Sequence, residues 1–130
     1  MESISDKKVR RWLALMRFGN RLGCHQIADR SFTFRGYQFP VCARCTGVII
    51  GEIVALPILL CGFRLHFFPC LLLILPLVAD GGLQYINVFR STNLRRVITG
   101  FFAGVGLTYL YCYLIEAFVE LLIYSLSFAF

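Results

Sequence analysis

The sequence predicts an all-α membrane protein with three transmembrane helices, preceded by a basic amphipathic helix and a loop that carries cysteine and histidine. Of the 130 residues, 58% are hydrophobic and only 15% are charged, and the mean hydropathy is +0.74. A soluble domain is about 25% charged, so this composition excludes a water-soluble fold of this size. The 13 Phe and 6 Tyr residues exclude a disordered chain, because such chains are poor in aromatic side chains.

Residues 1–23 have the pattern of a helix that lies in the membrane interface. Basic side chains gather opposite an apolar stripe with helical spacing, which is typical of interfacial helices, and a soluble docking helix is the alternative. We expect anionic lipid headgroups, rather than nucleic acid, to be the partner of this basic segment. The stripe consists of Val9, Trp12, Leu13 and Met16.

The three predicted spans cover about residues 46–63, 67–88 and 97–124, and together they form the transmembrane domain 46–130. Each supplies the roughly 20 residues that a helix needs to cross about 30 Å of hydrocarbon. GxxxG pairs occur in the first and third spans, at Gly47 and Gly51 and at Gly100 and Gly104. Such pairs allow close backbone approach to a neighbouring helix.

Two acidic residues, Glu52 and Asp80, fall inside the spans at a similar predicted depth. A charge within the bilayer normally faces the bundle interior and finds a partner, and Arg96 and Arg44 are close enough along the helix axes to reach inward. Pro76 and the glycines after Asp80 predict that the second span is kinked or broken there. These charges form either a structural clasp or part of an active site.

The polar segment 24–45 carries the strongest chemical signal in the chain. Cys42 and Cys45 form a CxxC pair at the start of a predicted helix, and Cys24 and His25 lie upstream in a loop. Three thiols and one imidazole are ligands that suit tetrahedral zinc, so we predict a zinc site formed by these four residues, or by the three cysteines with water in the fourth position. A redox-active thiol pair and unliganded thiols are the alternatives. The other three cysteines lie in apolar runs, where cysteine behaves as a small hydrophobic residue.

Several strings resemble the signature of an uncharacterised family of small prokaryotic membrane proteins, known only as a domain of unknown function. The resemblance covers about residues 20–105. It implies several membrane spans and a clustered Cys/His site, and it supplies no activity or substrate. The strings are CHQ at 24–26, RSF at 30–32, PVCARCTG at 40–47, DG at 80–81, Gln84 and NxxRxxTG at 93–100.

Three functions fit these observations. The first is a metal-dependent enzyme in the prokaryotic cytoplasmic membrane that acts on a lipid-linked or amphipathic substrate. In that enzyme Asp80 or Glu52 is the acid or base and Arg96 holds an anionic group. The second is a zinc-stapled protein that binds another membrane component, and the third is a thiol oxidoreductase that uses Cys42 and Cys45.

The distribution of basic residues predicts three crossings with the N-terminus in the cytoplasm and the C-terminus outside. Twelve of the 13 Lys and Arg residues lie in the N-terminal segment or around residues 89–96, and only Arg64 lies in the intervening turn. Reporter domains fused after Arg64 and after Phe130 should therefore both report an external location. A cytoplasmic signal from the Phe130 fusion would contradict this topology.

Overall fold

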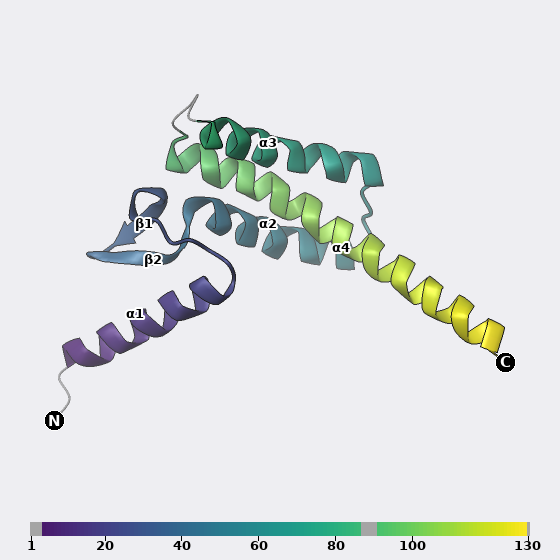
Figure 1. Cartoon of the computed structure of the whole chain (residues 1–130), viewed down its shortest axis with the longest axis horizontal. Helices are drawn as coiled ribbons and strands as arrows, with labels where there is room; N and C mark the ends of the chain where they lie inside the picture. The colour runs from purple at the N-terminus through teal and green to yellow at the C-terminus, as the bar shows by residue number, and fades with distance from the viewer. Residues whose placement is uncertain (1–3, 87–90, 130) are drawn as a thin grey trace.

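The chain forms four α-helices and one β-hairpin in a computed structural model that describes residues 4–86 and 91–129 (Figure 1). Within these residues three helices, α2 to α4, are long and apolar enough to cross a membrane, which confirms the predicted fold class. The elements are α1 (Ile4–Arg21), the 3₁₀ turn η1 (Ala28–Arg30), β1 (Ser31–Phe34), β2 (Tyr37–Cys42), α2 (Ala43–Leu60), α3 (Phe67–Tyr85) and α4 (Asn93–Ala129).

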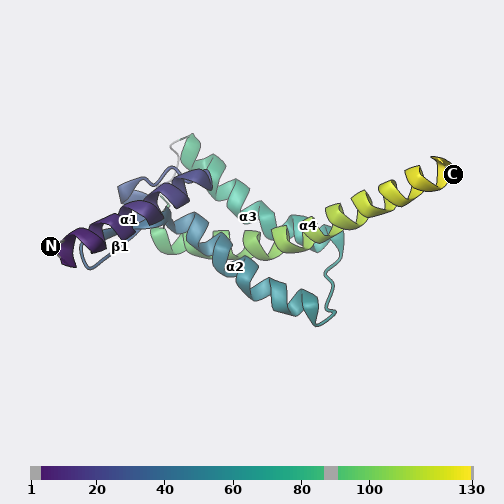
Figure 2. The same ribbon diagram turned by 90° about the horizontal axis from the view of Figure 1, so that it is seen from below.

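Helix α4 is the centre of the transmembrane bundle. It packs against both α2 and α3, and both views of the ribbon place it between them (Figures 1 and 2). The core cluster consists of Ala55 of α2, Cys70 of α3 and Tyr109 of α4. Helices α2 and α4 begin, and α3 ends, at the same end of the bundle, which we call the cysteine end because Cys42 and Cys45 lie there.

The α2–α4 contact depends on the two GxxxG pairs. A Cβ atom at Gly51 would overlap the carbonyl oxygen of Phe101, and one at Gly104 would overlap that of Val48. Gly47 and Gly100 are blocked in the same way by backbone atoms of the facing helix. The two motifs therefore pack against each other, and only glycine lets the backbones approach this closely.

Most of the bundle surface is apolar and exposed. Phe68, Leu72 and Ile53 are 79%, 67% and 65% exposed, as suits side chains that face lipid. Helix α4 is longer than the predicted span: its 37 residues measure about 55 Å at 1.5 Å per residue. Its C-terminal part accordingly extends past the ends of α2 and α3 (Figure 1).

The segment 24–45 contains a hairpin that the sequence analysis missed. Strands β1 and β2 pair antiparallel, and Arg35 and Gly36 both have positive φ angles, 51° and 82°, in the two-residue turn between them. Positive φ angles at both turn residues give a tight hairpin turn whose twist matches the right-handed twist of the two strands. The register is irregular between Ser31 and Thr33, where Pro40 of β2 is accommodated. The sequence did carry a signal for this hairpin, because aromatic and β-branched residues lie on both sides of Arg35 and Gly36.

Helix α1 docks on this hairpin. The indole Nε1 of Trp12 donates to the carbonyl oxygen of Gln38 at 2.8 Å, and the rings of Trp12 and Tyr37 lie 5.7 Å apart. The side chain of Gln26 donates to the Pro40 carbonyl at 2.6 Å, which fixes the loop that follows α1 against β2. The apolar side of α1 thus has a protein partner at Trp12, as in the docking alternative, while its membrane-interface location stays a prediction.

The sequence predicted that the second span is kinked or broken, and a break is wrong. Helix α3 continues through Pro76, Asp80 and both following glycines to Tyr85. Pro76 lies inside the helix, where the proline ring removes one backbone donor without ending the element. Asp80 is therefore presented from regular helix, and its orientation is set by the turn of α3.

Replacing Gly104 by alanine should destabilise the bundle by about 1–3 kcal/mol, because the new methyl group meets the backbone of Val48, which cannot yield as a side chain would. Thermal unfolding in detergent measures the effect. Gly82→Ala is the matched control, since no atom lies within 4 Å of a Cβ at that position. The control should be neutral or stabilising by up to about 1 kcal/mol. Equal stability of the two variants would contradict the packing argument.

Candidate metal centre

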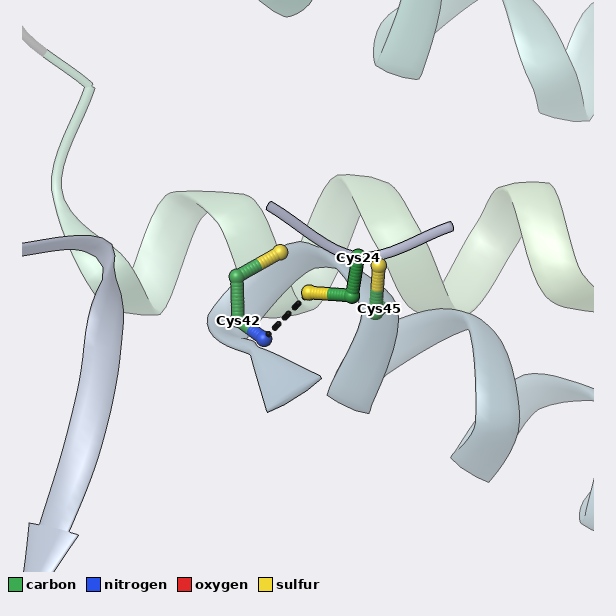
Figure 3. Close-up of side chains that lie close together, drawn as sticks. All are labelled: Cys24, Cys42 and Cys45. Atoms are coloured by element: carbon green, nitrogen blue, oxygen red, sulfur yellow. Dashed lines mark hydrogen bonds between the residues drawn. The ribbon is translucent and has the colours of Figure 1, made fainter. Parts of the chain in front are cut away.

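Three thiols converge at the cysteine end. The sulfur atoms of Cys24, Cys42 and Cys45 all lie within 4.8 Å of one another, and Figure 3 shows them gathered between the loop, the hairpin and α2. Zn–S bonds of about 2.3 Å place the sulfur ligands of a tetrahedral ion about 3.8 Å apart. Small side-chain rotations would bring the three sulfur atoms from their present separations to the separation that a bound zinc ion requires, so this triad could hold a metal ion.

Each thiol is positioned by a different element. Cys24 is buried in the loop after α1, and its sulfur accepts a hydrogen bond from the backbone N–H of Cys42 at 3.1 Å (Figure 3). Cys42 ends β2 and is the N-cap of α2, and Cys45 lies in the first turn of that helix. The hairpin missed in the sequence is therefore the device that returns the chain from Cys24 to Cys42.

The environment of Cys42 favours its thiolate form. Hydrogen bonding with the Cys45 thiol lowers the pKa of Cys42 to about 5, although burial acts in the opposite direction. The start of α2 adds the positive end of a helix dipole. Because the pKa of Cys42 is lowered and that of Cys45 is raised, Cys42 is the thiol of the pair that carries the negative charge, and the thiolate is the form that both binds metal and attacks disulfides.

His25 lies outside the triad. Among the described residues, the cluster contains the three cysteines and no histidine. His25 is exposed, and it lines a cavity of about 330 Å³ beside the triad. The structure therefore brings together three of the four predicted ligands and places the fourth at the rim of the same cavity.

Asp80 is a buried carboxylate that contacts three side chains near the site. It is 3% exposed, its carboxylate oxygens accept hydrogen bonds from Nη2 of Arg44 at 2.7 Å and from Oγ of Ser91 at 3.0 Å, and it forms an ion pair with Nε of Arg95 at 3.1 Å. The predicted pairing with Arg44 is confirmed. The predicted pairing with Arg96 is wrong, because the neighbouring Arg95 takes that position; one residue is a 100° rotation on a helix, and the sequence alone does not give the rotation of α4.

The two predicted acids lie at different sites. Glu52 is half-buried and lines a separate groove of about 470 Å³ between α2 and α4, together with Thr108 and Cys112. Asp80 supports Arg44, which lies between Cys42 and Cys45 and also donates to Gln84 at 3.3 Å. The catalytic roles predicted for both carboxylates stay predictions, and the contacts of Asp80 are those of a residue that positions others.

Comparison with known proteins agrees with this architecture. Residues 24–110 match the model of DUF2085, a family described as predicted membrane proteins. The chain belongs to this family. The match begins at Cys24 and includes the triad, α2, α3 and the first half of α4.

Two archaeal relatives of this DUF2085 protein are uncharacterized. One, from Methanothermobacter thermautotrophicus, is 38% identical over 105 residues, which cover 75% of this chain and 90% of the relative. The other, from Methanocaldococcus jannaschii, is 33% identical over 105 residues, which cover 76% of this chain and 65% of the relative. No solved structure matches the chain.

Changing Asp80 to asparagine should lower the free energy of unfolding by about 1–3 kcal/mol, because it removes a buried carboxylate that pairs with the partly exposed guanidiniums of Arg44 and Arg95. Unfolding in mixed detergent micelles measures the loss. Glu116→Gln is the control, since it breaks an ion pair with Arg64 that is exposed to solvent, and it should leave stability almost unchanged. An Asp80→Asn protein as stable as the wild type would show that the carboxylate does not hold the helices together.

Proposed function

We propose that this DUF2085 protein binds one zinc ion through Cys24, Cys42 and Cys45 and is a metal-dependent enzyme that acts on a lipid-linked or amphipathic substrate. The observation that carries the proposal is the triad itself: three thiols within 4.8 Å of one another in the wall of a cavity, with no fourth Cys, His, Asp or Glu ligand grouped with them in the described chain. A structural zinc site normally has four protein ligands, whereas a catalytic site keeps one position open.

The donor set supports zinc. Thiolates select soft or borderline ions over magnesium and calcium, and a compact three-sulfur site suits tetrahedral coordination. The lowered pKa of Cys42 favours metal binding, because its proton is displaced more easily than that of an ordinary thiol. When bound, zinc supplies Lewis-acid chemistry to a substrate atom in the open position.

The position of the cavity supports a lipid-linked substrate. The cysteine end carries nearly all of the basic residues, so the positive-inside rule places it at the cytoplasmic face of the cell membrane. A cavity at the end of the transmembrane helices is reached by a headgroup whose lipid tail stays in the bilayer. His25, at the rim of that cavity, is the side chain best placed to exchange a proton with such a substrate.

Two other functions each have an observation in their favour. The triad joins the loop after α1, the end of β2 and the start of α2, as a structural zinc staple in a non-enzymatic membrane-binding protein would. The low pKa of Cys42 beside a second thiol is typical of a thiol oxidoreductase. Metal content separates the oxidoreductase from the other two functions, and activity separates the enzyme from the staple.

Protein purified in a mild detergent should contain about one zinc per chain by elemental analysis, with three thiols protected from alkylation until a chelator is added. Cys42→Ser should release the metal, because it removes one of three ligands. Cys112→Ser is the matched control, since Cys112 lies on α4 outside the triad, and it should retain the metal. Full retention of metal by a Cys24, Cys42, Cys45 triple serine variant would overturn the site.

A further inference from the structure

Arg96 is a buried cation that pairs with no carboxylate in the part of the chain that the structure describes. It is 6% exposed, and its Nη1 donates to the side-chain oxygen of Asn93 at 2.9 Å. Its Nε is buried and has no hydrogen-bond partner among the residues that the structure describes. A buried polar group without a partner costs free energy, and a buried charge costs more, so such a group points to a ligand.

Two further arginines line the same cavity as Arg96. Arg30 reaches it from η1 and Arg44 from the start of α2, and both act electrostatically on Arg96. The Nε of Arg44 is also buried and unpartnered in the described chain. No described aspartate or glutamate lines the cavity. Three guanidinium groups from three segments therefore converge on one space that contains no opposing carboxylate.

The charges indicate which anion the cavity takes. Four guanidiniums (Arg30, Arg44, Arg95 and Arg96) surround this end of the bundle, and the Asp80 carboxylate neutralises one of their charges. A divalent ion held by three thiolates has a net charge of minus one. Two positive charges remain, which matches a dianion. Guanidinium groups bind phosphate oxygens in a bidentate geometry, and a phosphate monoester is close to dianionic at neutral pH.

We propose that this cavity is a phosphate-monoester site in which Arg96, Arg44 and Arg30 bind the phosphate beside the cysteine triad. The inference rests on the proposed function, because it names the chemical class of the substrate that the metal centre would act on. A volume of about 330 Å³ is at the small end of ligand sites, so the cavity accommodates a phosphorylated headgroup rather than a whole lipid. A lipid phosphate and a soluble phosphate share this chemistry.

The site is tested by thermal unfolding, in dodecyl maltoside, of protein whose zinc content has been measured. The probes are dioleoyl phosphatidic acid, dioleoyl phosphatidylcholine and inorganic phosphate. Phosphatidic acid should raise the unfolding temperature, and phosphatidylcholine, which lacks a monoester, should not. Arg96→Gln should weaken the apparent affinity by about tenfold or more, because charge-assisted hydrogen bonds to a buried guanidinium are strong. Arg30→Gln, at an exposed position that tolerates substitution, should weaken it by about threefold.

Arg21→Gln is the matched control, because Arg21 is an exposed arginine of α1 that does not line the cavity, and this variant should bind as the wild type does.

A response to phosphatidic acid alone assigns the site to a lipid, and a response to inorganic phosphate alone assigns it to a soluble ligand. If neither probe acts on protein that contains its zinc, the anion site is overturned and the metal proposal stands. If the probes act on protein that binds no zinc, the metal proposal fails and the anion site stands. A response to phosphatidic acid that is undiminished in both Arg96→Gln and Arg30→Gln would also overturn the site.

Discussion

The ion pairs and the hydrogen bonds of the buried Asp80 carboxylate hold the cysteine end of the bundle together. The carboxylate lies on α3, accepts hydrogen bonds from Arg44 of α2 and from Ser91 just before α4, and forms an ion pair with Arg95 of α4. One buried acid therefore joins all three spans, in a position where an unpaired charge of either sign would be costly. Because Arg44 lies between Cys42 and Cys45, the same bond fixes the start of α2 and with it two of the three thiols.

The glycine contact supplies the second constraint. Gly47 and Gly100 bring the first turns of α2 and α4 into backbone contact, so a residue near the start of one helix lies beside a residue near the start of the other. This packing delivers Arg44 and Arg96 to a single cavity although 52 positions separate them.

The cysteine triad and the arginines of the neighbouring cavity, Arg30, Arg44 and Arg96, are electrostatically complementary. Three thiolates close together repel one another, and nearby guanidiniums relieve that repulsion, as a bound cation would. The nearby arginines outnumber the single carboxylate of Asp80. Two of their positive charges would therefore remain for an anion once a divalent ion is bound to the triad. In the proposed site, a metal held by the triad would lie beside the cationic cavity, where the arginines would bind a headgroup by its phosphate.

The sequence by itself determined the composition-driven features: three apolar spans, their GxxxG pairs, the CxxC pair and its association with Cys24. These follow from local periodicity and spacing, which solvent and lipid impose on any fold of this chain. Only the tertiary structure decided which arginine meets Asp80, because Arg95 and Arg96 differ by one step of helix rotation that packing alone sets. It also decided that Glu52 and Asp80 lie apart, that His25 stands outside the triad, and that a hairpin returns the chain to Cys42. Those outcomes depend on long-range contacts, and a local sequence pattern does not encode the relative rotation of helices or the pairing of distant segments.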